Sequence, residues 1–257
     1  MIKVNVYSVK GEKGGQVELP IQFLEPVRFD LIKRSILSVH SRKRQAHGAD
    51  PLAGTRQGNA TSKRRQRYKT TYGARPGQSR IKRKYSFHQG RQFGWIGAFV
   101  ASAISGRRAF PPTSAKNIVE NINKKENRKA IRSAMAANAE TIKVIDDKFM
   151  NLKKTQEVQK FFEKLGLKDE IAKSKDKKIR AGKGTMRGRK YVRRKGALVV
   201  VAQETLATKA VNNIPGIDVV NVKRLNADIL CPGIRPRRNS IWTKESLETL
   251  KKERLYM

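Results

Sequence analysis

The sequence has a single cysteine, Cys231, in 257 residues. One cysteine forms no internal disulfide, and a zinc site built from several cysteines needs more than one. The chain also lacks a long apolar segment, because its longest weakly polar run, residues 93–105, is too short to span a bilayer. Residues 1–10 contain no apolar stretch of signal-peptide length. We therefore expect neither secretion nor membrane insertion.

Acidic residues are scarce, since 21 Asp and Glu face 58 Lys and Arg and leave a formal net charge of +37. A chain with this charge repels itself unless a polyanion screens it. Residues 41–110 have a net charge of +16 with Asp50 as their only acid, and residues 173–195 have +11 with only Asp176. The other 164 residues carry only +10. The charge therefore indicates an ordinary scaffold that bears two strongly basic insertions.

The scaffold has the hydrophobic patterns of alternating strands and helices. Strand patterns occupy residues 2–6, 141–145, 197–202 and 219–222, and helical patterns occupy residues 30–39, 127–138, 155–165 and 243–250. The continuous apolar run at residues 197–202 predicts a strand that is buried on both faces, as in a parallel sheet. Thr155 and Thr243 are expected to cap helices at their N-termini, and Gly166 is expected to end one.

Strands that alternate with helices predict an α/β fold. We expect a layered globular domain with a mostly parallel sheet flanked by helices, plus a long basic extended loop. Residues 1–40 and 111–257 are expected to form the domain, and residues 41–110 to form the loop inserted in it. Residues 173–195 are expected to form a second basic segment within the domain.

Residues 41–110 contain nine glycines and no sustained hydrophobic period, which predicts a stretch without regular secondary structure. A disordered insertion is one interpretation. Disordered segments are usually poor in aromatic residues, however, and aromatics interleaved with arginine suit base stacking together with phosphate pairing. The aromatics here are Tyr68, Tyr72, Tyr85, Phe87, Phe93, Trp95 and Phe99. For the apolar run at residues 93–105, three alternatives remain open: packing in a core, on RNA or on another protein.

The glycine- and lysine-rich string at residues 181–196 matches neither common nucleotide-binding pattern. A Walker A loop needs serine or threonine after its Gly-Lys pair, where Gly184 stands here. The dinucleotide pattern needs a third glycine, where Arg187 stands. Glycines that let the backbone approach a polyanion, next to arginines that pair with phosphates, indicate contact with RNA.

Candidate catalytic and metal-binding residues are few. His40, His47 and His88 have neither metal-ligand spacing nor an acidic partner nearby in the sequence. Asp146 and Asp147 are expected to lie in a solvated turn, because adjacent strand residues point to opposite faces and do not share a magnesium ion. We expect no catalytic residue, no metal ligand and no cofactor, with structural Mg²⁺ present only in association with RNA.

Three classes of function explain the charge to different degrees. A structural RNA-binding protein accounts for both basic segments and for the α/β scaffold. An RNA-modifying or RNA-processing enzyme with a Rossmann-like core is the alternative, although it lacks an intact nucleotide-binding fingerprint. An architectural DNA-binding protein explains the charge but not an α/β scaffold with a glycine-rich loop.

Six blocks of the sequence, in order along the chain, resemble the L4 family of large-subunit ribosomal proteins in its archaeal and eukaryotic form. The blocks are Leu19–Ile32, Arg42–Arg56, Ala109–Pro112, Arg128–Ala137, Leu152–Val158 and Lys178–Arg194. The length and charge suit an archaeal member. The resemblance implies a structural protein of the large ribosomal subunit in the cytoplasm, which supports assembly and whose extended loop lines part of the nascent-peptide exit tunnel. Its partners would be large-subunit rRNA, neighbouring ribosomal proteins and the nascent chain, without a membrane.

The basic segments and the resemblance together give a set of candidate binding residues. The rRNA-binding candidates are Arg42, Lys43, Arg44, Arg56, Lys63, Arg64, Arg65, Arg67, Lys69, Arg80, Lys82, Arg83, Lys84, Arg91, Arg107, Arg108, Lys178, Arg180, Lys183, Arg187, Arg189, Lys190, Arg193 and Arg194. By the resemblance, the tip of the tunnel loop comprises Tyr72, Gly73, Arg75, Pro76, Gly77, Gln78 and Arg80.

Overall fold

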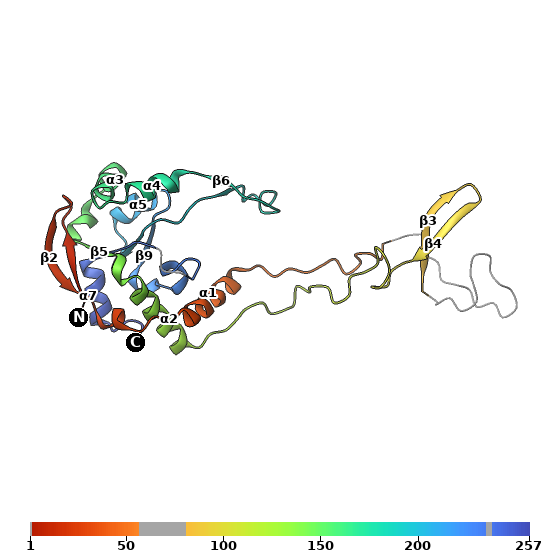
Figure 1. The fold of residues 1–257 in the computed structure, drawn as a ribbon, viewed down its shortest axis with the longest axis horizontal. Helices are drawn as coiled ribbons and strands as arrows, with labels where there is room; N and C mark the ends of the chain where they lie inside the picture. Colours follow the sequence, from red (N-terminus) through yellow and green to blue (C-terminus); the bar gives the residue numbers. More distant parts are fainter. Residues whose placement is uncertain (1, 57–80, 235–237) are drawn as a thin grey trace. The chain divides into compact units, whose positions relative to one another are not determined.

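A computed structural model describes residues 2–56, 81–234 and 238–257 of the chain (Figure 1). The chain divides into two compact units. Residues Met1–Lys43 and Val119–Met257 form one unit, which we call the α/β domain, and Arg44–Ile118 form the other, which we call the inserted unit. Within the described residues, no helix is long and apolar enough to cross a membrane.

The α/β domain is built on a six-stranded sheet. Its strands are β1 (Lys3–Tyr7), β2 (Lys13–Glu18), β5 (Ile142–Ile145), β8 (Leu198–Val201), β9 (Asp218–Asn221) and β10 (Ser240–Thr243), in the order β2-β1-β5-β10-β8-β9. Strand β2 pairs antiparallel with β1, whereas every other neighbouring pair is parallel. The sheet is therefore mostly parallel, as the sequence predicted.

Strand β8 shows why the sheet needs cover on both sides. Leu198 and Val200 belong to one apolar cluster, and Val199 and Val201 belong to the other. All four side chains are almost completely buried. Alternate residues of a strand point to opposite faces, so a strand that is apolar at every position must lie between two layers. The prediction from the continuous apolar run is confirmed.

Helices supply the two covering layers, one on each side of the sheet (Figure 1). One face packs against α1 (Phe29–Lys43), α2 (Lys124–Ala137), α6 (Ala227–Leu230), α7 (Lys244–Lys252) and the short 3-10 helices η1 (Ile21–Leu24) and η4 (Val222–Arg224). The other face packs against α3 (Thr155–Lys164), α4 (Lys168–Lys175), α5 (Leu206–Asn212) and η3 (Asp147–Asn151). A further 3-10 turn, η2 (Ala139–Thr141), precedes β5. The predicted layered α/β fold is confirmed.

Two of the three predicted helix ends are correct. The Thr243 side chain accepts a hydrogen bond from the Ser246 amide and caps α7. Gly166 has a φ of +79° after α3, and the amides of Gly166 and Leu167 donate to Glu163 and Phe162, which is a Schellman ending. Thr155 is not an N-cap: it is already the first helical residue, and Lys154 precedes it without a side-chain cap.

The inserted unit contains regular structure that the sequence did not predict. Strands β3 (Arg83–Gln89) and β4 (Gln92–Gly97) form an antiparallel hairpin that turns at Gly90 and Arg91. The pairing register shifts at Ser86, between Tyr85 and Phe87. This irregularity and the glycines of β4 interrupt the apolar–polar alternation by which a strand is recognised. The expectation of no regular secondary structure here was therefore wrong.

Candidate nucleic-acid interface

The second basic segment is a hairpin that projects from the α/β domain between α4 and β8 (Figure 1). Two short strands, β6 (Lys178–Ile179) and β7 (Tyr191–Val192), pair antiparallel at its base. We call residues 173–195 the basic hairpin. All of its basic side chains are exposed, namely Lys173, Lys175, Lys177, Lys178, Arg180, Lys183, Arg187, Arg189, Lys190, Arg193, Arg194 and Lys195. None of them forms an ion pair with a described residue.

Backbone hydrogen bonds and glycines organise the end of this hairpin. Gly182 and Gly188 have φ values of +83° and +76°, which L side chains rarely adopt. The Gly184 carbonyl accepts from the amides of Arg187 and Arg189 at 3.2 and 2.9 Å. Arg180 Nε donates to the Arg189 carbonyl at 3.0 Å, and a Cβ on Gly184 would lie 2.6 Å from Arg180 Cδ. Arg180 therefore helps to fix the conformation of the loop through these contacts with Arg189 and Gly184.

The two ends of the basic hairpin meet at a tightly packed neck. The Gly196 amide donates to the Gly216 carbonyl at 2.7 Å. Gly216 has a φ of +84°, and a Cβ there would lie 2.4 Å from the Cβ of Ser174. Ser174 is buried at the end of α4, so only glycine fits at position 216. The close packing fixes where the basic hairpin leaves the domain.

Arg238 is a further residue that contacts this neck. Its side chain is buried, and it donates to the carbonyls of Gly196 and Ala197 at 2.8 and 3.2 Å. It also donates to the Ile229 carbonyl at 2.9 Å and pairs with the Asp218 carboxylate at 2.5 Å. Gly196 and Ala197 directly follow the basic hairpin, so Arg238 holds the chain where that segment enters β8. No local pattern in the sequence marks Arg238 as a functional residue, because its partners lie far away along the chain.

The ends of the domain chain that flank the inserted unit are also tied together. Ser38 Oγ donates to the Glu120 carbonyl at 2.7 Å, and the Glu120 amide donates to Ser41 Oγ at 3.0 Å. Both serines are buried on α1. These bonds hold residue 120 beside the last turn of α1, so the chain leaves and re-enters the domain at one place.

Asp228 anchors the same end of α1. Its buried carboxylate lies 2.9 Å from His40 Nε2 and 2.9 Å from Lys43 Nζ. Burial by itself would raise the pKa of Asp228, but the hydrogen bonds from Lys43 and His40 outweigh it and hold the pKa below the ordinary value. His40 has no acidic residue near it in the sequence, but the fold brings Asp228 to it from 188 residues away.

We expect Asp228→Asn to destabilise the protein by about 1–3 kcal/mol at pH 7, because the hydrogen bonds with the Lys43 ammonium and the His40 ring lose their charged partner. A carboxyl with a lowered folded-state pKa stabilises the fold above its unfolded-state pKa of about 4, and this contribution disappears as the pH falls through the folded-state pKa. The difference between variant and wild type should therefore shrink in acid. Urea unfolding at pH 7 and at successively lower pH measures it.

Asp50→Asn is the matched control, because Asp50 pairs with Arg56 at 2.6 Å where both side chains are largely exposed. Such a surface pair contributes little. A pH-independent loss in Asp228→Asn, or an equal loss in the control, would contradict the role given to the buried carboxylate.

The remaining candidates fall into three groups. Arg42 and Lys43 end α1, and Arg44 and Arg56 are exposed at the start of the inserted unit. Lys82, Arg91, Arg107 and Arg108 are exposed in that unit, whereas Arg83 and Lys84 lie half-buried in β3. Lys63, Arg64, Arg65, Arg67, Lys69 and Arg80, and the tip residues Tyr72, Gly73, Arg75, Pro76, Gly77 and Gln78, lie outside the described residues.

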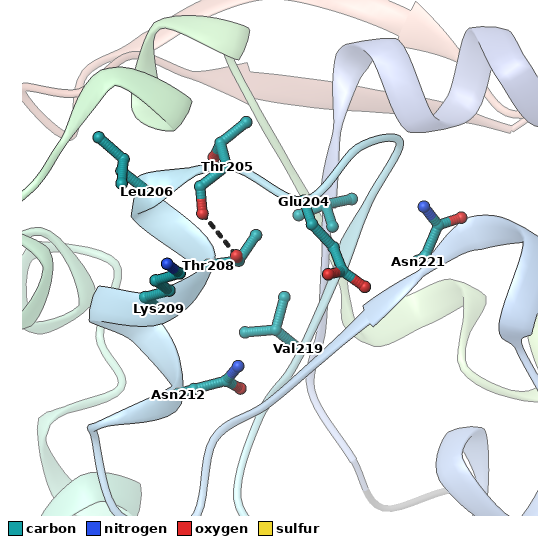
Figure 2. Close-up of a pocket in the computed structure, with 9 residues that line it drawn as sticks. Glu204, Thr205, Leu206, Thr208, Lys209, Asn212, Val219 and Asn221 are labelled. Carbon is teal, nitrogen blue, oxygen red and sulfur yellow. Dashed lines mark hydrogen bonds between the residues drawn. The ribbon is translucent and has the colours of Figure 1, made fainter.

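A surface cavity of about 510 Å³ lies at the carboxyl ends of β8 and β9, where α/β enzymes commonly bind ligands (Figure 2). Its one carboxylate is Glu204, which lies 3.7 Å from the Arg224 guanidinium. Thr208 Oγ1 donates to the Thr205 carbonyl at 2.6 Å, so this hydroxyl is engaged within α5 and its cap. The cavity offers no pair of carboxylates for acid–base catalysis.

Other catalytic arrangements are equally unsupported in the described part of the chain. Asp146 and Asp147 open η3, where Asp146 accepts from the Asp147 amide and Asp147 accepts from the Glu245 amide at 3.0 Å. Burial raises the pKa of the Cys231 thiol to about 11, which leaves little thiolate near neutral pH. No group of three His, Cys, Asp or Glu side chains among the described residues is arranged to hold a metal ion.

Comparison with known proteins identifies the family. The profile of the Ribosomal protein L4/L1 family matches residues 17–253. The large ribosomal subunit protein uL4 of Nanoarchaeum equitans is 42% identical and covers 99% of this chain and 100% of the relative. The proteins of the same name from Methanocaldococcus jannaschii and Archaeoglobus fulgidus are 40% and 36% identical, and each comparison covers 97% of this chain and 98% of the relative. Proteins of this family are structural and not enzymes, and the matched relatives are archaeal. The chain belongs to the Ribosomal protein L4/L1 family, archaeal type.

Proposed function

We propose that this protein is an rRNA-binding structural component of the large ribosomal subunit in the cytoplasm, where it supports assembly. The observation that carries the proposal is the basic hairpin, in which twelve Lys and Arg side chains are exposed and form no ion pair with the described acids. Leaving this much like charge together without counterions is unfavourable. A polyanion compensates it, and the names of the matched relatives point to the polyanion of a ribosome.

The chemistry is phosphate binding by a hairpin of fixed shape. Arginine presents a planar fork that matches two phosphate oxygens, and lysine presents a point charge. Such contacts fix register and orientation on RNA but read no sequence, so the recognition is of RNA shape. The neck at Ser174, Gly216 and Arg238 reduces the ordering cost of binding, because the base of the hairpin is already fixed in the free protein.

Within this proposal, the candidate residues divide by environment. Arg187, Arg189, Lys190, Arg193 and Arg194 of the basic hairpin contact phosphates. The exposed cations of the inserted unit, among them Lys82, Arg91, Arg107 and Arg108, contribute a second set of phosphate contacts. Mg²⁺ enters only as a structural counterion of the rRNA.

Sedimentation of cell extract tests the proposal. The protein should comigrate with large subunits and remain bound in high salt, because rRNA assembled around an integral component retains it even though salt weakens each phosphate contact. An enzyme that visits the ribosome, or a DNA-binding protein, would be released into the light fractions or found with DNA. Either outcome would overturn the proposal.

We further propose that the loop tip at residues 72–80 lines the exit tunnel and does not anchor the protein. A chain without residues 71–81 should then still enter large subunits, because the described basic residues on both sides remain. Its ribosomes should pause differently on arrest-prone nascent chains, as measured by ribosome profiling. Unchanged pausing in subunits that contain the shortened chain would contradict a tunnel role, and failure to incorporate would make the tip an anchor.

A further inference from the structure

The β3–β4 hairpin carries aromatic rings on both of its faces. On one face the Tyr85 and Trp95 rings lie 4.2 Å apart between centroids at an interplanar angle of 34°, and the Tyr85 ring lies 5.9 Å from His88. Tyr85 is 41% exposed. The register shift at Ser86 turns the next residue, Phe87, to the other face, opposite Gly94. The hairpin therefore presents aromatic surface in two directions.

Gly94 sets the position of the Phe87 ring. A Cβ at position 94 would lie 2.7 Å from Phe87 Cε1 and 2.5 Å from Ser86 Oγ, so the ring rests against a backbone that has no side chain. Phe87 is nevertheless 56% exposed. One side of the ring is thus supported by the hairpin, while a large part of the ring is accessible.

Charges around these rings show what kind of partner the hairpin fits. Lys82 and Arg91 are exposed at its two ends, and Arg83 and Lys84 lie within β3. The only acid of the inserted unit, Asp50, pairs with Arg56. Exposed rings among cations, without nearby carboxylates, are complementary to a ligand that combines flat aromatic groups with negative charge. Unpaired nucleotides have this combination, whereas paired bases inside a duplex present only their edges.

We propose that the β3–β4 hairpin is a stacking platform for unpaired nucleobases of RNA, with Phe87 and Tyr85 as the rings and Lys82 and Arg91 as partners of the adjacent phosphates. This inference rests on the proposed RNA-binding function and adds the kind of RNA that this part of the chain selects. The basic hairpin binds phosphates of any RNA, whereas the β3–β4 hairpin requires single-stranded or bulged nucleotides.

Tryptophan fluorescence of the full chain provides the test. The chain has two tryptophans, and Trp242 is completely buried in the core beneath Phe23, whereas Trp95 lies on the hairpin. The probes are a 12-nucleotide oligoadenylate and a blunt 12-base-pair RNA duplex, titrated at the same salt concentration. We expect the oligoadenylate to quench Trp95 on binding, and the duplex to bind without quenching it.

Variants of Phe87 separate stacking from simple packing. Phe87→Leu keeps an apolar side chain but removes the ring, so it should weaken oligoadenylate binding by roughly 5- to 150-fold, the effect of losing one base–aromatic stack. Duplex binding should not change. Phe87→Tyr keeps the ring and should bind as wild type does. Gly94→Ala pushes the Phe87 ring away from its support and should weaken oligoadenylate binding even though no ring is lost.

Failure of the stacking inference and failure of RNA binding give different results. If both probes bind, and Phe87→Leu changes the affinity for the oligoadenylate no more than the affinity for the duplex, the stacking platform is wrong while the proposed function stands. If neither probe binds, the proposed function itself is contradicted. Quenching of Trp95 by large-subunit proteins freed of rRNA, but not by oligoadenylate, would assign the hairpin to a protein partner and overturn the inference.

Discussion

Removing four arginines from the basic hairpin is expected to flatten the salt dependence of rRNA binding by about 3 units in the slope of log K against log salt concentration. Each phosphate that a protein neutralises releases condensed counterions and contributes about 0.7–0.9 to that slope. Affinity at low salt should fall by orders of magnitude, because these exposed guanidinium groups have no ion-pair partner among the described residues. The four residues changed to alanine are Arg187, Arg189, Arg193 and Arg194.

The matched control removes the same amount of charge from another surface of the α/β domain. Four exposed lysines on or next to α3 serve this purpose, namely Lys153, Lys154, Lys160 and Lys164. Their change to alanine alters the net charge equally and should leave the slope nearly unchanged. Filter binding to large-subunit rRNA fragments between low and high salt measures both variants. Equal slopes in the two variants would mean that the arginines contribute only through the overall charge of the protein.

Arg238→Met is expected to destabilise the α/β domain by about 3–5 kcal/mol, because it leaves three carbonyls without their donor and removes the buried member of the ion pair with the half-exposed Asp218. The carbonyls of Gly196, Ala197 and Ile229 lose the partners that Arg238 now provides. Methionine fills much of the space that the aliphatic part of the Arg238 side chain occupies. The expected loss of stability therefore comes from the missing hydrogen bonds and ion pair and not from a cavity. A loss of this size is a large fraction of the stability of a typical domain.

Arg224→Met is the control for Arg238→Met. Arg224 lies 3.7 Å from Glu204, and both side chains are mostly exposed, so this pair contributes little. Urea unfolding followed by far-UV circular dichroism compares the two variants with wild type. Similar midpoints for the two variants would show that the neck beneath the basic hairpin does not depend on Arg238.

Local patterns in the sequence were enough to determine the layers of the fold and the location of its charge. The apolar run at residues 197–202 predicted a central strand because every side chain of such a strand must be covered. Thr243 and Gly166 marked helix ends because their hydrogen bonds and dihedral angles involve residues within one turn. The basic hairpin was visible because like charges adjacent in sequence are also adjacent in space.

Only the tertiary structure decided which residues hold these segments in position. Arg238 contacts Gly196 and Ala197 across more than forty residues, and Asp228 reaches His40 across 188. No short-range period encodes such a pair, because each partner is a single polar residue whose role depends on where two distant elements pack. The β3–β4 hairpin lacks a sequence signature for a different reason, since its register shift and glycines remove the alternation of apolar and polar residues that marks a strand. The sequence by itself therefore determined the elements and the charge, whereas the contacts that orient the binding segments exist only after the chain has folded.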